Sequence, residues 1–181
     1  VDIVIDDGRR WLNRHPESKF DFIVMNTTWN WRGHSTNLLS VEFMELARAR
    51  LNPGGILYFN TTSSDDAKKT AATVFPHAMR VWNFMAVSDS PFTYDKERWR
   101  YTLTNMKIDN QPVVDLSDPE SKAFLDDEVE YADTIHKPPT DDSLETRESV
   151  LKRADAAGAK IITDDNMVPE WRQVLRFQDP P

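Results

Sequence analysis

The chain has 181 residues, 39% of them hydrophobic, which fits one soluble globular domain with a packed core. Its formal charge of −8 and pI near 5.0 argue against a nucleic-acid surface, which needs clustered Lys and Arg. The absence of cysteine excludes disulfides, thiolate metal sites and a cysteine nucleophile, and it favours a cytoplasmic, reducing location. No apolar run approaches the roughly 18 residues of a membrane helix, so we expect any membrane segment upstream of Val1.

The first part of the chain alternates strands with polar turns. An apolar run at 1–5 predicts a strand that ends at Asp6-Asp7-Gly8, and a short helix follows at 9–14. The next apolar run, 20–25, is nearly continuous, which is typical of a central strand covered on both faces. It ends in the polar turn Asn26-Thr27-Thr28. Turns at the carboxyl ends of such strands form the edge where α/β sheets bind nucleotides.

A helix and a third strand complete this unit. Ser40 is the expected N-cap of a helix over 41–51, and Pro53-Gly54-Gly55 ends that helix. The strand at 56–60 then returns parallel to the preceding one. We therefore expect an α/β, Rossmann-like fold with a mostly parallel sheet and flanking helices.

The remaining elements are mainly helical. They are a helix at 65–74 capped by Ser63 or Ser64, a strand at 80–87, a helix favoured over a strand at 95–106, helices at 118–132 and 143–157, and a strand at 160–163. We assign 1–106 to the carboxyl-side part of the Rossmann-like cofactor-binding domain. Residues 107–181 are expected to form a helical extension with a terminal strand segment, packed on the same domain.

A glycine-rich phosphate loop is missing from this pattern. The chain has five glycines, and no three of them can form a GxGxxG turn after a strand. It also begins directly in an expected strand, without Met. We therefore expect that the amino-terminal part of the fold is missing, either because the chain is part of a larger domain or because preceding residues are outside the numbering.

Five short motifs together resemble one protein family. They are Asp7-Gly8 after a strand, Asn26-Thr27-Thr28 after the next strand, Leu39-Ser40-x-Glu42-Phe43, the segment 51–57, and the segment 162–166. In this order the motifs resemble the spermidine/spermine synthase family of polyamine aminopropyltransferases, a branch of the class I methyltransferase-like fold. The last segment is similar to the carboxyl-terminal signature of bacterial synthase-like members, some of which carry membrane segments before this domain.

The resemblance implies a site and its substrates. Asp7, with Gly8, would accept a hydrogen bond from the adenine amino group of decarboxylated S-adenosylmethionine or S-adenosylmethionine, bound as co-substrate without a metal. Asn26 and Thr27 would face the reacting centre, and an amine or polyamine would receive the aminopropyl group. Read without the family, Asp7-Gly8 is simply a turn.

Asn26 departs from the family pattern. Members that make polyamines usually have an Asp there, which takes a proton from the attacking amine, and an amide cannot do this. Three explanations stay open: a base supplied by Asp89, Asp164 or Asp165, an acceptor that needs no strong base, or loss of catalysis. Leu38-Leu39-Ser40 also replaces the family's Leu-Tyr.

Other functions remain as alternatives. The chain could be a non-catalytic binding or assembly module on this scaffold, or a methyltransferase that uses S-adenosylmethionine. Trp29, Trp31 and His34 share one loop, where aromatic rings could hold a cation or adenine, although packing is the commoner role. Asp164-Asp165 could bind a metal or an amine, or cap a helix. A homodimer is a further expectation.

Overall fold

The structure is a computed structural model that describes residues 1–26, 36–140 and 142–166. The candidate residues Thr27, Trp29, Trp31 and His34 lie outside the described residues, as does the tail after Trp171. The chain groups into two compact units, Val1–Pro91 with Thr146–Pro181, and Phe92–Glu145. These limits differ from the division at 106/107 expected from the sequence.

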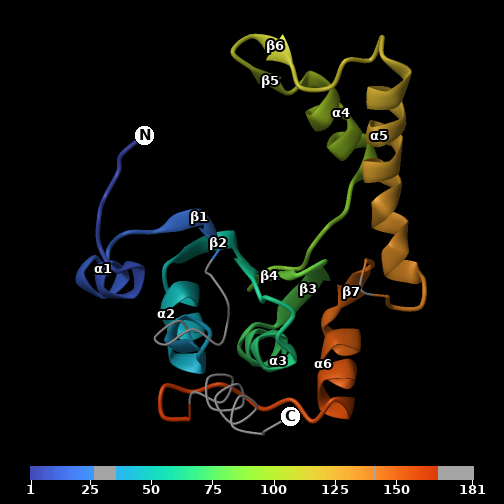
Figure 1. The fold of residues 1–181 in the computed structure, drawn as a ribbon. Helices are drawn as coiled ribbons and strands as arrows, with labels where there is room; N and C mark the ends of the chain where they lie inside the picture. The colour runs from blue at the N-terminus through green and yellow to red at the C-terminus, as the bar shows by residue number, and fades with distance from the viewer. Residues whose placement is uncertain (27–35, 141, 167–181) are drawn as a thin grey trace, which may run out of the picture. The chain divides into compact units, whose positions relative to one another are not determined.

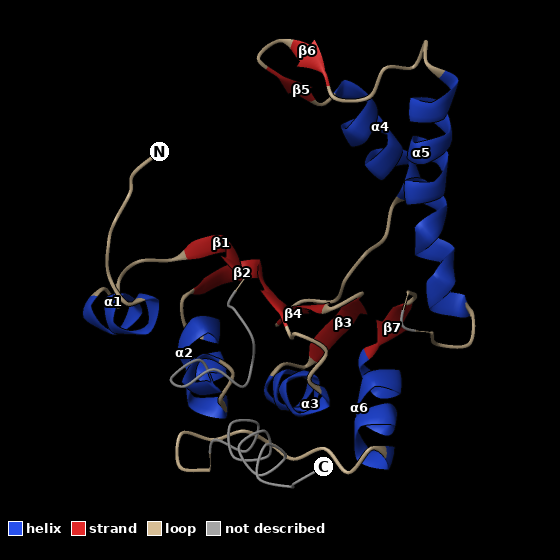
Figure 2. Ribbon diagram, viewed as in Figure 1, coloured by secondary structure: helices blue, strands red, loops and turns tan. Residues whose placement is uncertain are grey.

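The first unit is built on a mixed β-sheet (Figures 1 and 2). The strands are β1 (Phe20–Met25), β2 (Leu51–Asn60), β3 (His77–Val81) and β4 (Phe84–Ser88), in the order β1-β2-β4-β3, and the short β7 (Leu144–Thr146) spans the boundary between the units and follows β3 in the sheet order. β1 and β2 are parallel, as the sequence predicts, whereas β4 is antiparallel to both β2 and β3. The expected α/β fold with flanking helices is confirmed.

Within the described part of this unit four α-helices accompany the sheet, and Figure 1 shows α2, α3 and α6 together below it. They are α1 (Gly8–Arg14), α2 (Val41–Arg48), α3 (Asp65–Val74) and α6 (Arg147–Ala156), and a 3-10 turn, η1 (Thr36–Leu38), precedes α2. Each helix begins after a side-chain cap, supplied in chain order by Asp7, Ser40, Ser64 and Thr146. These caps satisfy amide groups that a helix leaves unpaired at its first turn. The predicted caps at Ser40 and Ser64 are confirmed.

The core lies between the helices and the sheet. Leu57 and Phe59 of β2 and Met85 of β4 are completely buried, and Phe43 and Met44 of α2 pack against the same cluster. The small residues of α3 join them: Ala67, Ala71 and Ala72. Burial of these side chains supplies most of the stabilisation, at roughly 25 cal/mol per Å² of apolar surface.

The second unit is a separate helical arrangement. It contains α4 (Lys96–Asn105), β5 (Lys107–Ile108), β6 (Gln111–Pro112), α5 (Pro119–Glu130) and the 3-10 segment η2 (Tyr131–His136). α4 packs on α5, with Leu125 and Val129 of α5 and Val114 in a small core. The helix favoured at 95–106 and the helix start at Asp118-Pro119 are both confirmed.

Two expectations at the start of the chain are wrong. Residues 1–5 form no strand, and Val1, Ile3, Val4 and Ile5 are exposed, because no described strand lies beside them to pair with their backbone groups. β1 is not central but lies at the end of the sheet order. Its side chains alternate instead of being buried on both faces, with Phe22 53% and Val24 59% exposed.

Three later expectations need correction. The single strand at 80–87 is a hairpin, because Trp82 takes a left-handed backbone (φ 55°) and the chain reverses between β3 and β4. Residues 160–163 form no strand, since helices supply their hydrogen-bond partners: the Lys160 amide donates to Asp66, and the Ile162 amide to Thr70. The helix expected from 143 begins only after β7.

No helix in the described ranges is both long and apolar enough to cross a membrane.

The Asn52–Gly55 segment offers a test of the β1–β2 pairing. A Cβ atom on Gly55 would lie 2.9 Å from the carbonyl oxygens of both Asn52 and Phe20, whereas one on Gly8 would meet no atom within 4 Å. Gly55→Ala should therefore lower the free energy of unfolding by about 1–3 kcal/mol, since the backbone of β1 must shift. Gly8→Ala, in the first turn of α1, should leave it unchanged or raise it slightly. Urea titrations of both variants check this, and equal stabilities would contradict it.

Candidate functional site

The Asp6–Gly8 turn begins α1 and carries two carboxylates. Asp7 Oδ1 accepts a hydrogen bond from the Arg10 amide at 2.7 Å, which is the helix cap. Asp6 pairs with the Arg10 side chain, and this hydrogen bond lowers the pKa of Asp6. In the described residues Asp7 Oδ2 has no hydrogen-bond partner, so Asp7 keeps one exposed acceptor for a ligand.

The carboxyl ends of β1 and β2 meet at one edge of the sheet. Asn26 follows β1, and its Oδ1 accepts a hydrogen bond from Asn60 Nδ2 at 3.0 Å. Asn60 Oδ1 in turn accepts from the Thr62 amide at 2.8 Å. The parallel pairing of the strands places these amides side by side. An amide–amide contact therefore occupies the position where the resemblance implies a base.

An open cleft of about 410 Å³ lies beside this edge. Asp6 and Gly8 of the turn and Met25 at the end of β1 line it together. Arg9 is the remaining charged residue of its lining. The apolar wall consists of Val4, Trp11, Leu12, Phe20, Phe22, Ile23, Val24, Leu38 and Phe43. Two residues of the turn after residues 1–5 thus share one cavity with the end of β1, whereas the predicted site residues Asp7 and Asn26 are not part of its lining.

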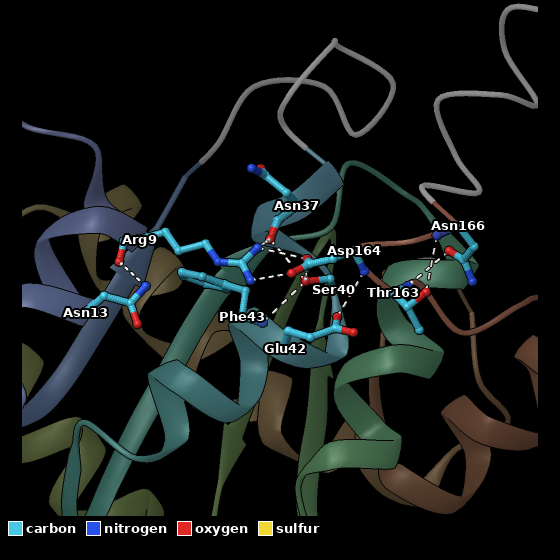
Figure 3. A network of polar contacts seen from close by, with 9 residues as sticks. All are labelled: Arg9, Asn13, Asn37, Ser40, Glu42, Phe43, Thr163, Asp164 and Asn166. Atoms are coloured by element: carbon cyan, nitrogen blue, oxygen red, sulfur yellow. Dashed lines mark hydrogen bonds and ion pairs between the residues drawn. The ribbon is translucent and has the colours of Figure 1, made fainter.

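A cluster of polar residues borders the cleft (Figure 3). Arg9 donates to both carboxylate oxygens of Asp164, with Nη1 at 2.8 Å from Oδ1 and Nη2 at 2.5 Å from Oδ2. Arg9 Nη1 also donates to the carbonyl oxygen of Asn37 at 2.9 Å. This two-pronged ion pair joins α1 to a segment 155 residues away in the sequence.

Asp164 also binds the start of α2. Its Oδ1 accepts from the hydroxyl of Ser40 at 2.7 Å, and its backbone amide donates to Glu42 Oε2 at 3.0 Å. The hydrogen bond from Arg9, and after it the bond from Ser40, lowers the pKa of Asp164 below its usual range. Asp164 is therefore a stable carboxylate and a weak base.

Asp165 differs from its neighbour. The turn that carries both residues is held by Asn166, whose Oδ1 accepts from the Thr163 amide and whose Nδ2 donates to the Ile161 carbonyl. Asp165 is exposed, and no hydrogen bond or ion pair is found for its side chain among the described residues. Of the two acids, Asp165 is the one whose charge is not already compensated.

Asp89, the third candidate base, lies elsewhere. It follows β4, which runs antiparallel to β2, so Ser88 pairs with Ile56 in the middle of β2 and not with Asn60 at its end. Asp89 also forms an ion pair with Arg48 at 2.7 Å. The fold thus separates Asp89 from Asn26 by the length of a strand.

The sequence analysis did not identify Arg9, Glu42 and Asn60 as site residues. Arg9 stands two positions after Asp7, and a cation beside an acidic turn was the available signal. Its partner Asp164 could not be found from local sequence, because the contact depends on the tertiary fold. In the described ranges no cluster of three or more His, Asp or Glu residues is placed to hold a metal ion.

Comparison with solved structures supports the fold. The chain is similar to the crystal structure of a probable spermidine synthase from Corynebacterium glutamicum ATCC 13032, with a TM-score of 0.52 and 18% sequence identity. The match covers 91% of this chain and 54% of the other, so the chain spans about half the length of that structure. No family model and no curated protein sequence matches. At this identity the likeness shows a shared methyltransferase-like fold.

The Arg9–Asp164 pair predicts a pH-dependent stability. Because the folded-state pKa of Asp164 is lowered, its contribution is present above the unfolded pKa, about 3.9, and is lost as the pH falls through the folded value. Asp164→Asn should cost roughly 0.5–1 kcal/mol at pH 7, as for a partly exposed ion pair, and progressively less as the pH falls below about 4. Asp165→Asn is the matched control and should leave stability unchanged. Thermal unfolding across this pH range checks both, and identical profiles for the two variants would contradict the assignment.

Proposed function

We propose that this chain is part of a transferase that binds an adenosyl sulfonium compound and transfers its aminopropyl, or another alkyl, group to an amine. The observation that carries the proposal is the shared cleft, where the Asp6–Gly8 turn and the end of β1 meet over an apolar wall. Adenine is a flat group with a polar edge, so a cleft of this composition suits it. The methyltransferase-like fold supports the same reading.

Asp7 is the proposed adenine ligand. One of its oxygens is used by the helix cap, and the other is free in the described residues to accept from the exocyclic amine. Such a carboxylate discriminates adenine from a base that carries a carbonyl at that position, because a carboxylate is an acceptor only. Gly8, which lines the cleft, leaves room for the ring beside it.

Asp165 is the proposed partner of the amine. Asn26 is an amide, Asp164 is neutralised by Arg9, and Asp89 lies at the other end of the sheet. Asp165 directly follows Asp164 in the chain, and an exposed, uncompensated carboxylate can attract an ammonium ion and accept its proton. Of the three candidate bases, Asp89, Asp164 and Asp165, we therefore propose Asp165.

A non-catalytic binding module is the second candidate. The observation that favours it is the contact between Asn26 and Asn60, which closes the edge of the sheet with two groups that cannot take a proton. Such a module would still bind the adenosyl group but would not transfer it. A product assay separates the two functions, because only the transferase converts a bound sulfonium to methylthioadenosine.

Calorimetric titration of the whole protein tests the adenine site. S-adenosylmethionine, its decarboxylated form and methylthioadenosine should all bind, since they share adenosine. Asp7→Ser keeps a helix cap but removes the second oxygen, so it should weaken all three by the same roughly 1–3 kcal/mol. The control is Asp89→Asn, because Asp89 does not line the cleft. This variant should bind all three compounds with the affinity of the parent protein. Absence of heat with all three compounds would sink the proposal.

Turnover tests the role of Asp165. With decarboxylated S-adenosylmethionine and a diamine, Asp165→Asn should lower kcat/KM by about 100-fold or more, as for loss of a general base, without changing the affinity for methylthioadenosine. Asp89→Asn should retain the parental rate. Equal rates for parent and Asp165→Asn would remove this residue from the mechanism, and no turnover by the parent protein would favour the binding module.

A further inference from the structure

The Arg9–Asp164 ion pair belongs to a larger hydrogen-bonded cluster. Its members come from three segments: Arg9 from α1, Ser40 from the start of α2, and Asp164 from the carboxyl-terminal turn (Figure 3). Arg9 also holds the carbonyl of Asn37 in η1. We call these four residues, Arg9, Asn37, Ser40 and Asp164, the clasp.

One member of the clasp, Arg9, lines the cleft, and residues close in sequence to two other members also line it. Arg9 lines the cleft itself, next to Gly8, and Leu38 and Phe43 from the η1–α2 segment line its other wall. Ser40 lies between these two apolar residues in the sequence, and its hydroxyl donates to both Asp164 Oδ1 and the Asn37 carbonyl. The spacing of the two walls is thus fixed by one set of hydrogen bonds.

The clasp acts on the Asp7 turn through α1. Asp7 is the N-cap of this helix and Arg9 is its second residue, so fixing the guanidinium also fixes the first turn that orients Asp7. α1 has only seven residues, too few to be held by its own hydrogen bonds in water. Its orientation depends on tertiary contacts, of which the two-pronged ion pair is the most directional.

We propose that Arg9 and Asp164 are positioning residues, which hold the Asp6–Gly8 turn against the η1–α2 wall at the separation that an adenosine group needs. The inference rests on the proposed function for the identity of the ligand, while the geometry of the clasp stands without it. Neither residue needs to touch the ligand. The carboxyl-terminal segment thereby takes part in a site whose lining residues lie between Val4 and Phe43.

A double-mutant cycle on the whole protein tests the clasp. Arg9→Gln, Asp164→Asn and the double variant should each weaken methylthioadenosine binding by about tenfold, and the double variant no more than either single one, because each change breaks the same contact. Arg9→Lys keeps the charge but loses the fork, and should give an intermediate Kd. If the charge-removing variants fold poorly, the Kd of Arg9→Lys tests the proposal instead.

Asp89→Asn controls for a merely structural effect. It breaks the Arg48–Asp89 ion pair, which lies outside the clasp and outside the lining of the cleft, so at a temperature where all variants are folded it should bind methylthioadenosine as the parent does. An unchanged Kd in Asp164→Asn, additive losses in the double variant, or an equal loss in Asp89→Asn would each overturn the proposal.

Amide hydrogen exchange without ligand separates the clasp from the proposed function. The Arg10 and Phe43 amides, which donate to Asp7 and Ser40, should exchange faster in Asp164→Asn than in the parent or in Asp165→Asn. If the parent binds no adenosyl compound, the proposed function fails, and this measurement still decides the clasp. Unchanged exchange at both amides would overturn it.

Discussion

The parallel pairing of β1 with β2 is the contact on which the rest of the first unit depends. It brings Asn26 and Asn60 to one edge and places the end of β1 beside the cleft. The pairing is close enough at Gly55 that no side chain fits there. The completely buried Leu57 and Phe59 then fix β2 on the helical layer, so the edge that carries the polar groups is set by the core beneath it.

The two adjacent acidic residues Asp164 and Asp165 differ in how their charges are compensated. Asp164 is held by Arg9, Ser40 and Glu42, and the hydrogen bonds from Arg9 and Ser40 to its side chain lower its pKa. Asp165, its neighbour, is free of such contacts in the described residues. Two adjacent acids therefore have different chemistry because of their surroundings, one suited to bracing the fold and the other to meeting a cation.

The fold of this protein does not by itself determine the chemistry of the site. A methyltransferase-like sheet can present many kinds of site, because function depends on the side chains at its carboxyl edge and not on the sheet itself. Here that edge carries the amides of Asn26 and Asn60 where the proposed transfer needs a proton acceptor, and the proposed acceptor Asp165 comes from the carboxyl-terminal turn. The proposed transfer therefore depends on the side chains of Asp7 and Asp165 in particular.

Several local elements can be predicted from the sequence alone, including α2 after Ser40, α3 after Ser64 and the parallel return of β2, because caps, prolines and apolar periodicity act over a few residues. The strands predicted at 1–5 and 160–163 are absent, since a strand exists only where a neighbouring strand can pair with it. The Arg9–Asp164 ion pair and the position of Asp89 away from Asn26 are visible only in the tertiary structure. Those facts depend on strand direction and on contacts between distant segments, which no local pattern encodes.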